Sequence, residues 1–275
     1  MDKPTHIIQN PLFREAINRV VEKRIYKTDD DYLMVIDGYT GSGKSTFASQ
    51  VVFHVSERMK SEYDINDLSI EAEEFINLLS KKQFCVVWLD EGGTALFSRD
   101  SMKKLNIGIA KAFFMLRAQH LFIVICIPSF YFLDQLLRAT RVNCLTHCYE
   151  NRGEKGYFVA YNRRQVMWLN NTRAKYKDYD TRRCQGSKYS IKGKFSDYNP
   201  YNPKYLQISI KKKQDYLKKI AEPKQEKTEN RYTERDKAIV SMVDSGLSCR
   251  QVGNLMGISG ARVSQIVKML SSVNT

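Results

Sequence analysis

Eight residues in the first fifth of the chain combine glycines, a lysine and hydroxyls at a spacing that suits phosphate. Residues 38–45 read GYTGSGKS and fit the pattern G-x-x-x-x-G-K-[ST]. Glycines let the backbone turn tightly and point several N–H groups inward at phosphate oxygens. Lys44 would reach the β- and γ-phosphates of a nucleotide, and the Ser45 hydroxyl would hold Mg²⁺. The residues predicted to bind ATP are Gly38, Tyr39, Thr40, Gly41, Ser42, Gly43, Lys44, Ser45 and Thr46. The alternative is an ordinary Gly/Ser-rich loop.

A pair of carboxylates follows an apolar run further along the chain. Residues 84–91 read FCVVWLDE, which is the Walker B pattern of a buried strand that ends in acidic residues. Asp90 would bind Mg²⁺ through water, and Glu91 would polarise an attacking water as the general base. The alternative is a surface turn that carries two acidic residues by chance.

The segments around these motifs predict the elements that must position them. Residues 32–36 are an apolar strand and residues 46–54 a helix, so the glycine-rich loop joins a strand to a helix N-terminus. Further strands are predicted over 121–129, 141–150 and 156–161. Helices are predicted over 10–24, 69–79, 102–120 and 130–141, with Ser69 as an N-cap. This alternation predicts an α/β domain with a mostly parallel sheet.

The six cysteines are scattered, as expected of reduced thiols. Val142, Cys144, Thr146 and Cys148 alternate and should share one face of a strand, with His147 on the other. A metal site here is the less favoured interpretation, because no second ligand pair follows at zinc spacing. No secretory leader is evident, and the longest apolar run is too short to cross a bilayer. We therefore expect a cytoplasmic protein without a membrane segment.

The net charge of +14 is concentrated in one part of the chain. Residues 1–150 carry 18 basic and 19 acidic residues, whereas residues 151–235 carry 22 and 9. Ten of the sixteen tyrosines also lie in the basic stretch. Lysines and arginines interleaved with aromatic rings suit a nucleic acid backbone with stacked bases. The alternative is a solvated linker whose tyrosines pack on the preceding domain.

The last forty residues show a helix-turn-helix pattern. Helices are predicted over 233–244, 248–257 and 260–270, with a core shared by Val252, Leu255, Ile258, Val263 and Ile266. The pattern resembles sigma-factor region four and resolvase-type DNA-binding domains. The third helix would then enter the major groove of double-stranded DNA. Its predicted DNA-binding residues are Ser259, Arg262, Ser264, Gln265 and Lys268. A helical hairpin that only mediates oligomer contacts is the alternative.

An ordered set of features in residues 30–165 resembles the RecA-like P-loop ATPases of the FtsK–HerA group and the related Zot-like and packaging ATPases. The set comprises the Asp-Glu strand end, a helix that ends in LRAQH, an apolar strand, Pro-Ser and the sequence LDQLLR. In that group a polar residue at the end of the strand after Walker B senses the γ-phosphate, which here leaves Cys126 or Ser129. An arginine from a neighbouring subunit often completes the site. The resemblance therefore implies a homo-oligomer, with Arg138 and Arg141 as the candidate arginines and Arg117 behind them.

These observations predict three regions and leave three functions open. The regions are a P-loop ATPase domain (1–170), a basic tyrosine-rich segment and linker (171–230), and a small all-α helix-turn-helix domain (231–275). The first hypothesis is a DNA-associated ATPase that couples Mg-ATP hydrolysis to transfer, packaging or replication of a mobile or viral element. The second is an ATP-switched DNA-binding regulator with little turnover. A nucleotide or polynucleotide kinase is the third, and Glu91 argues against it because hydrolases place a water-activating carboxylate there.

Overall fold

The structure, a computed structural model, describes residues 6–28, 30–90, 119–171, 190–221 and 234–271. Most of the helix predicted over 102–120, together with Glu91 and Arg117, lies outside these ranges. The chain divides into two compact units, Met1–Leu217 and Lys218–Thr275. We describe each unit by itself.

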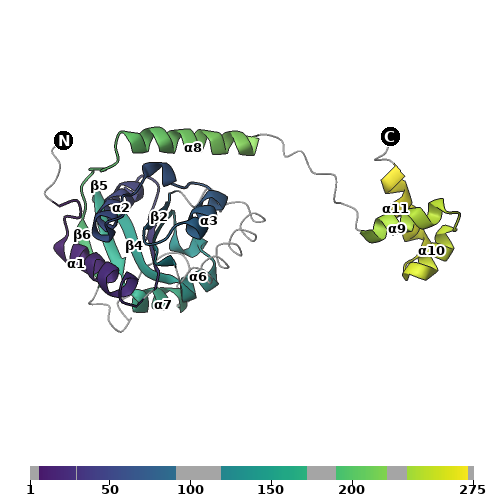
Figure 1. The fold of residues 1–275 in the computed structure, drawn as a ribbon, viewed down its shortest axis with the longest axis horizontal. Helices are drawn as coiled ribbons and strands as arrows, with labels where there is room; N and C mark the ends of the chain where they lie inside the picture. Colours follow the sequence, from purple (N-terminus) through teal and green to yellow (C-terminus); the bar gives the residue numbers. More distant parts are fainter. Residues whose placement is uncertain (1–5, 29, 91–118, 172–189, 222–233, 272–275) are drawn as a thin grey trace. The chain divides into compact units, whose positions relative to one another are not determined.

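A six-stranded sheet forms the centre of the first unit (Figure 1). Its strands lie in the order β2-β3-β1-β4-β5-β6. The first four in this order run parallel, and β5 and β6 are added antiparallel at one side. The strands are β1 (Tyr32–Asp37), β2 (Val86–Leu89), β3 (Phe122–Ile127), β4 (Val142–Asn151), β5 (Glu154–Tyr161) and β6 (Ile191–Lys194). The predicted α/β fold with a mostly parallel sheet is confirmed.

Helices cover both faces of this sheet, which explains why its central strands are apolar on both sides. On the first face lie α1 (Pro11–Arg19) with its π-helical continuation η1 (Val20–Ile25), α2 (Lys44–Met59) and α8 (Lys204–Ala221). On the second face lie α3 (Ala72–Lys81), α6 (Gln135–Thr140) and α7 (Arg163–Asn171). Two short 3₁₀ turns, η2 (Ile65–Asp67) and η4 (Phe130–Phe132), complete the unit.

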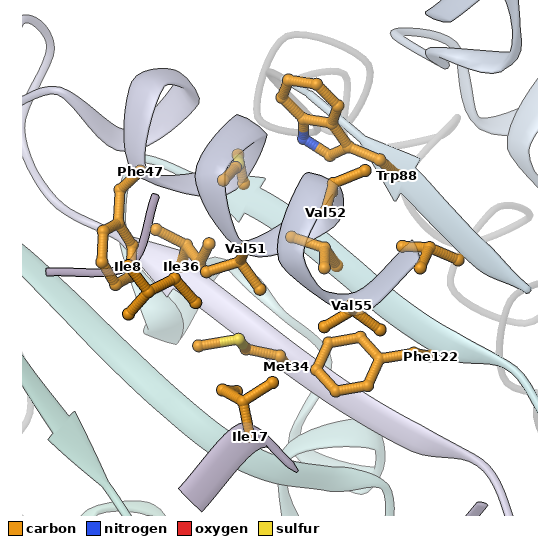
Figure 2. Close-up of a cluster of buried hydrophobic side chains, with 14 of the residues drawn as sticks. Ile8, Ile17, Met34, Ile36, Phe47, Val51, Val52, Val55, Trp88 and Phe122 are labelled. Atoms are coloured by element: carbon orange, nitrogen blue, oxygen red, sulfur yellow. The ribbon is translucent and has the colours of Figure 1, made fainter. Parts of the chain in front are cut away.

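Alternate residues of β1 anchor the two layers. Met34 and Ile36 point toward Val51 and Val55 of α2 (Figure 2), and all four side chains are fully buried. The intervening residues of the strand belong to the core of the second face. Because burial of one such side chain contributes about 1.5–3 kcal/mol, this double packing holds the strand rigidly beneath the loop that follows it.

The pairing of β4 with β1 contains a bulge that the sequence pattern did not indicate. Leu33 pairs with Val142, but the next residue of β1 pairs with Cys144. Between these two pairs, the Asn143 side-chain oxygen accepts a hydrogen bond from the Leu33 N–H at 2.8 Å. Val142 therefore packs on the second face, and the prediction that it shares the cysteine face is wrong. Cys144 and Cys148 both lie in the core of the first face, as predicted.

Ser69 has a different role from the predicted N-cap. Helix α3 begins at Ala72 and its N-cap is Glu71. Ser69 is fully buried and forms an isolated parallel bridge with Leu89 of β2. Its N–H donates to the Trp88 carbonyl at 3.0 Å, and its own carbonyl accepts from the Asp90 N–H at 2.8 Å. This bridge extends the strand pairing up to Asp90 and holds that residue's backbone.

The basic region after Trp168 contains structure that composition alone did not reveal. Strand β6 pairs with β5, and α8 follows it. Gln50 of α2 donates hydrogen bonds to the carbonyls of Ser196 and Tyr198, at 2.8 and 2.7 Å. The chain up to residue 217 thus belongs to the first unit, although the sequence suggested a domain boundary at 170.

The second unit begins within the last turn of α8, and its other described helices are α9 (Glu234–Asp244), α10 (Cys249–Met256) and α11 (Gly260–Ser271). They share a core of Ile239, Val252, Val263 and Ile266. A capping box between Ser248 and Gln251 starts α10, and Gly257, at φ +67°, ends it. The predicted core position of Leu255 is wrong, because its side chain is 68% exposed. Met256, four residues after Val252, lies on the buried side of the helix instead.

Candidate phosphate-binding site

The loop between β1 and α2 has a backbone that requires glycine. Gly38, Gly41 and Gly43 have φ angles of +146°, +83° and +90°, which side chains rarely tolerate. A Cβ on Gly38 would lie 2.1 Å from the carbonyl oxygen of Cys148. One on Gly43 would lie 3.0 Å from the ring of Phe195. The glycines therefore meet both a conformational and a steric demand.

Lys44 is the first residue of α2, and its side chain folds back over the loop. The ammonium donates to the carbonyls of Gly38 and Tyr39, both at 2.8 Å. These acceptors are neutral, so they do not compensate the ammonium charge. Phosphate oxygens would replace them as stronger acceptors. The buried hydroxyl of Ser42 has no hydrogen-bond partner within the described residues. A cation and an unsatisfied hydroxyl in a glycine cradle are features that fit a bound phosphate.

Ser45 and Asp90, the predicted Mg²⁺ ligands, are brought into contact. The Ser45 hydroxyl donates to Asp90 Oδ1 at 2.9 Å, and the carboxylate is fully buried. Two elements bring them together, because α2 begins at the end of β1 and Asp90 follows β2, with β3 between the two strands. A hydroxyl beside a carboxylate supplies the oxygen ligands that Mg²⁺ prefers when phosphate and water complete its shell. Across the described ranges, no group of three or more His, Cys, Asp or Glu side chains gathers at a metal-binding distance.

Tyr205 is part of this site, and sequence reasoning missed it. Its hydroxyl donates to Asp90 Oδ2 at 2.8 Å. Its ring stacks on Trp88 with centroids 5.6 Å apart and planes 7° from parallel. Burial, followed by the nearby charge of Asp90, raises the pKa of Tyr205 far above its usual value, so the phenol remains a donor. The nearest sequence signal is a pair of tyrosines, Tyr201 and Tyr205, spaced to share a helical face.

Asp37 joins three elements beneath the loop. Its Oδ1 is 2.9 Å from Nδ1 of His147 on β4. Its Oδ2 accepts the N–H of Phe130 at 2.8 Å. The carboxylate is fully buried and immediately precedes Gly38. The start of the loop is therefore tied to the neighbouring strand and to the turn after β3.

The end of β3 offers few polar groups. The Cys126 thiol is buried in the core of the first face. Its pKa is raised, first by burial and then by the negative charge of Asp90. The Ser129 hydroxyl accepts the N–H of Tyr131 at 3.4 Å and so caps η4. Of the two candidate sensor residues, Cys126 therefore packs in the core and Ser129 caps a turn.

The two candidate arginines differ in position. Arg141 is 8% exposed and forms a buried ion pair with Asp31. Each of these residues directly precedes a parallel strand, so the pair lies at the sheet edge opposite the loop. The role of Arg141 in a neighbouring subunit's site stays a prediction. The Arg138 guanidinium lies over the rings of Phe130 and Tyr131, 5.5 and 5.3 Å from their centroids. Glu91 and Arg117 fall outside the described residues.

The predicted DNA-binding residues lie on and just before α11. Ser259 caps the helix by accepting the N–H of Arg262 at 3.2 Å. Arg262 donates to the side-chain oxygen of Gln265 at 3.1 Å. Both of these side chains and that of Lys268 are exposed, whereas Ser264 is half-buried. The helix therefore presents a polar and basic face outward from its unit.

Comparisons with known proteins found little. No protein-family model matches the chain, and no curated protein matches it. One solved structure similar to it is the N-terminal domain of zonular occludens toxin from Neisseria meningitidis, at 14% sequence identity and a TM-score of 0.37. That similarity covers 61% of this chain and 94% of the other. None of the helices that the structure describes has the length and apolar character needed to cross a membrane.

Proposed function

We propose that this protein is a DNA-associated ATPase that couples hydrolysis of Mg-ATP to the handling of DNA. The contact between Ser45 and Asp90 carries the proposal, because it joins the two predicted motifs into one site. The positive-φ glycines support it, since such a loop directs N–H groups at phosphate. Transfer, packaging or replication of a mobile or viral element is the setting that we propose.

Each residue at this edge of the sheet has a role in the proposal. Lys44 would exchange the carbonyls of Gly38 and Tyr39 for phosphate oxygens. Ser45 and Asp90 would hold Mg²⁺, which when bound neutralises charge on the phosphate oxygens. Glu91 follows Asp90 directly and is the carboxylate that we propose to orient and deprotonate the attacking water. Arg138 remains our candidate for completing the site of a neighbouring subunit in a homo-oligomer.

DNA binding is proposed for the second unit and the basic region before it. The exposed side chains of Arg262, Gln265 and Lys268 on α11 are of the types that contact base edges and phosphates. We propose that α10 and α11 act as a helix-turn-helix on double-stranded DNA, with Ser259 and Ser264 adding backbone contacts. The excess of 22 basic over 9 acidic residues in 151–235 would add affinity that does not depend on sequence.

Measuring ATP turnover with and without double-stranded DNA tests the enzymatic part. We expect DNA to stimulate turnover and Glu91→Gln to abolish it while ATP binding persists. Glu62→Gln, which changes an exposed glutamate far along the chain from both motifs, is the matched control and should leave turnover unchanged. A wild-type protein that binds no ATP would contradict the proposal.

The DNA-binding part is tested by the double substitution Arg262→Ala with Lys268→Ala. Both side chains are exposed, so the three-helix core should be retained. We expect weaker DNA binding with a shallower salt dependence, because phosphate contacts release counterions, and unchanged ATP binding. Unchanged DNA affinity would instead favour a helical unit that serves protein contacts.

One observation favours the second hypothesis, an ATP-switched DNA-binding regulator. Near the end of β3, which lies between β1 and β2, Cys126 is a buried thiol, and the Ser129 hydroxyl that follows the strand caps a turn. Neither is Gln, Asn or Thr, the residues that the resemblance associates with sensing of the γ-phosphate. ATP-dependent DNA binding without turnover would support the regulator, and phosphate transferred to an added acceptor would support a kinase.

A further inference from the structure

Asp90 has its two carboxylate oxygens held by two different helices. Ser45, in the first turn of α2, donates to Oδ1 at 2.9 Å. Tyr205, in the first turn of α8, donates to Oδ2 at 2.8 Å. Asp90 is fully buried and Tyr205 is 8% exposed, so the bond between them lies out of bulk water, whereas the bond from Ser45 is partly buried. A carboxylate whose two oxygens accept from hydroxyls on two different helices is held in one orientation.

The ring of Tyr205 is positioned by the strand that carries its acceptor. It stacks on Trp88, two residues before Asp90, with planes only 7° from parallel. Trp88 is itself fully buried. Because the ring has a single well-packed position, its hydroxyl can point at only a narrow region of space. Asp90 Oδ2 occupies that region.

Further contacts hold α8 against the sheet on the C-terminal side of Tyr205. The Lys212 ammonium donates to the carbonyl of Leu68 at 2.6 Å and forms an ion pair with Glu74. Leu68 directly precedes Ser69, whose carbonyl accepts the N–H of Asp90. Helix α8 therefore makes two kinds of contact near Asp90. Tyr205 bonds to the Asp90 side chain, and Lys212 bonds to the segment that holds the Asp90 backbone.

We propose that Tyr205 is a positioning residue for the metal-binding carboxylate, and that it sets the affinity of the site for Mg²⁺. This inference rests on the proposed function. The phenol fixes Oδ2 and so leaves the Oδ1 side, where Ser45 lies, for the cation. Without the phenol the carboxylate is free to rotate and loses a donor, which weakens its hold on Mg²⁺. Removing a hydrogen-bond partner of a metal ligand commonly weakens metal affinity by about tenfold or more.

The test uses Tyr205→Phe, which removes the hydroxyl and keeps the ring on Trp88. Its matched control is Tyr201→Phe, since Tyr201 belongs to the same segment and its ring packs on Phe53 and Tyr63. ATP affinity is measured by titration calorimetry on the full-length protein, first in EDTA and then over a series of Mg²⁺ concentrations. Bound Mn²⁺ is measured in parallel by electron paramagnetic resonance.

We expect Tyr205→Phe to raise the Mg²⁺ and Mn²⁺ concentrations for half-maximal binding by about tenfold. Its ATP affinity in EDTA should match the wild type. The control should match the wild type throughout. A Tyr205→Phe protein with the wild-type metal dependence would overturn the inference alone. So would one that loses ATP affinity equally in EDTA, which would show a purely structural role. A wild type that binds no ATP would overturn the proposed function and this inference with it.

Discussion

The two edges of the central sheet differ in the partners of two cationic side chains, Lys44 and Arg141. At the edge where β1 and β2 end, Lys44 is held by neutral carbonyls and Asp90 accepts bonds from neutral hydroxyls. At the edge where β1 and β4 begin, Arg141 and Asp31 neutralise each other directly in a buried ion pair. The same strands supply both edges. A charge held by neutral dipoles still attracts a ligand of opposite sign, whereas a charge held by its counterion is already compensated.

This difference concerns Arg141, one of the two arginines that the resemblance proposes for a neighbouring subunit's site. Arg141 became a candidate because it follows the sequence LDQLLR, one of the features that carry the resemblance to the FtsK–HerA group. However, its guanidinium is closed off by Asp31 and by the surrounding core. The comparison of the edges therefore predicts that substitutions at one should change stability, and that those at the other should change ligand binding.

The largest expected effect is at the closed edge. Arg141→Met should destabilise the first unit by about 3–5 kcal/mol, because it removes the guanidinium that pairs with the buried Asp31 carboxylate. Denaturant unfolding followed by tryptophan fluorescence measures this. The exposed pair of Arg19 and Glu15 supplies the control, and Arg19→Met should cost less than about 1 kcal/mol. The double substitution Arg141→Met with Asp31→Leu should recover much of the loss; if it does not, the ion pair is not the cause.

The next effect is at the open edge. Lys44→Ala should weaken ATP binding by about 100-fold, since a charge-assisted contact to phosphate contributes up to about 3 kcal/mol. Stability should change little, because the lysine bonds only to loop carbonyls. Calorimetric titration with Mg-ATP and a thermal melt measure the two quantities. Lys81→Ala, at an exposed lysine on α3, should alter neither; equal loss in both variants would mean that the effect is long-range electrostatics.

A smaller effect is expected where the loop meets the hairpin beside it. Gly43→Ala should cost about 1–2 kcal/mol in stability, through backbone strain at φ +90° and contact with Phe195. Gly153 has a similar φ of +81° with no atom near its absent side chain, so Gly153→Ala reports the strain alone. The difference between their unfolding free energies isolates the steric part. Equal values would show that the Phe195 ring yields to the new methyl group.

An effect of similar size concerns His54 on α2, away from both edges. Burial lowers the pKa of His54 from 6.5 to about 4, and the positive charges of Arg14 and His6 contribute. Between these two values the unfolded chain binds more protons than the folded one. Stability should therefore fall as the pH drops from about 6.5 to about 4, by about 1–2 kcal/mol because the ring is partly hydrated. Unfolding curves across this range measure the loss. His54→Gln should flatten the dependence, and an unchanged slope would assign it to other groups.

The sequence predicted those features that depend on the residue types within one contiguous stretch. The glycine loop, the apolar strand before it, the apolar strand before Asp90, and the helices of the second unit were all predicted from spacing and periodicity. Such patterns work because a parallel strand buried on two faces must be apolar throughout, and because a tight phosphate loop needs residues without a Cβ.

The remaining features depend on partners that are distant in the sequence. Asp31 and Arg141 are 110 residues apart, and Asp90 and Tyr205 are 115 apart. Nothing near Tyr205 marks it as a ligand of a carboxylate, and the composition of β6 and α8 resembles that of a solvated linker. Leu255 was misplaced for a related reason: an apolar residue on a short helix is buried only if another element covers its side.

By itself, the sequence determined the identity and order of the phosphate-loop and carboxylate residues, because each belongs to a contiguous motif. Only the tertiary structure decided which arginine is closed off by a counterion and which hydroxyls hold Asp90. The physical reason is that a side chain's charge and hydrogen-bonding capacity are properties of its type, whereas their availability to a ligand depends on what packs against it.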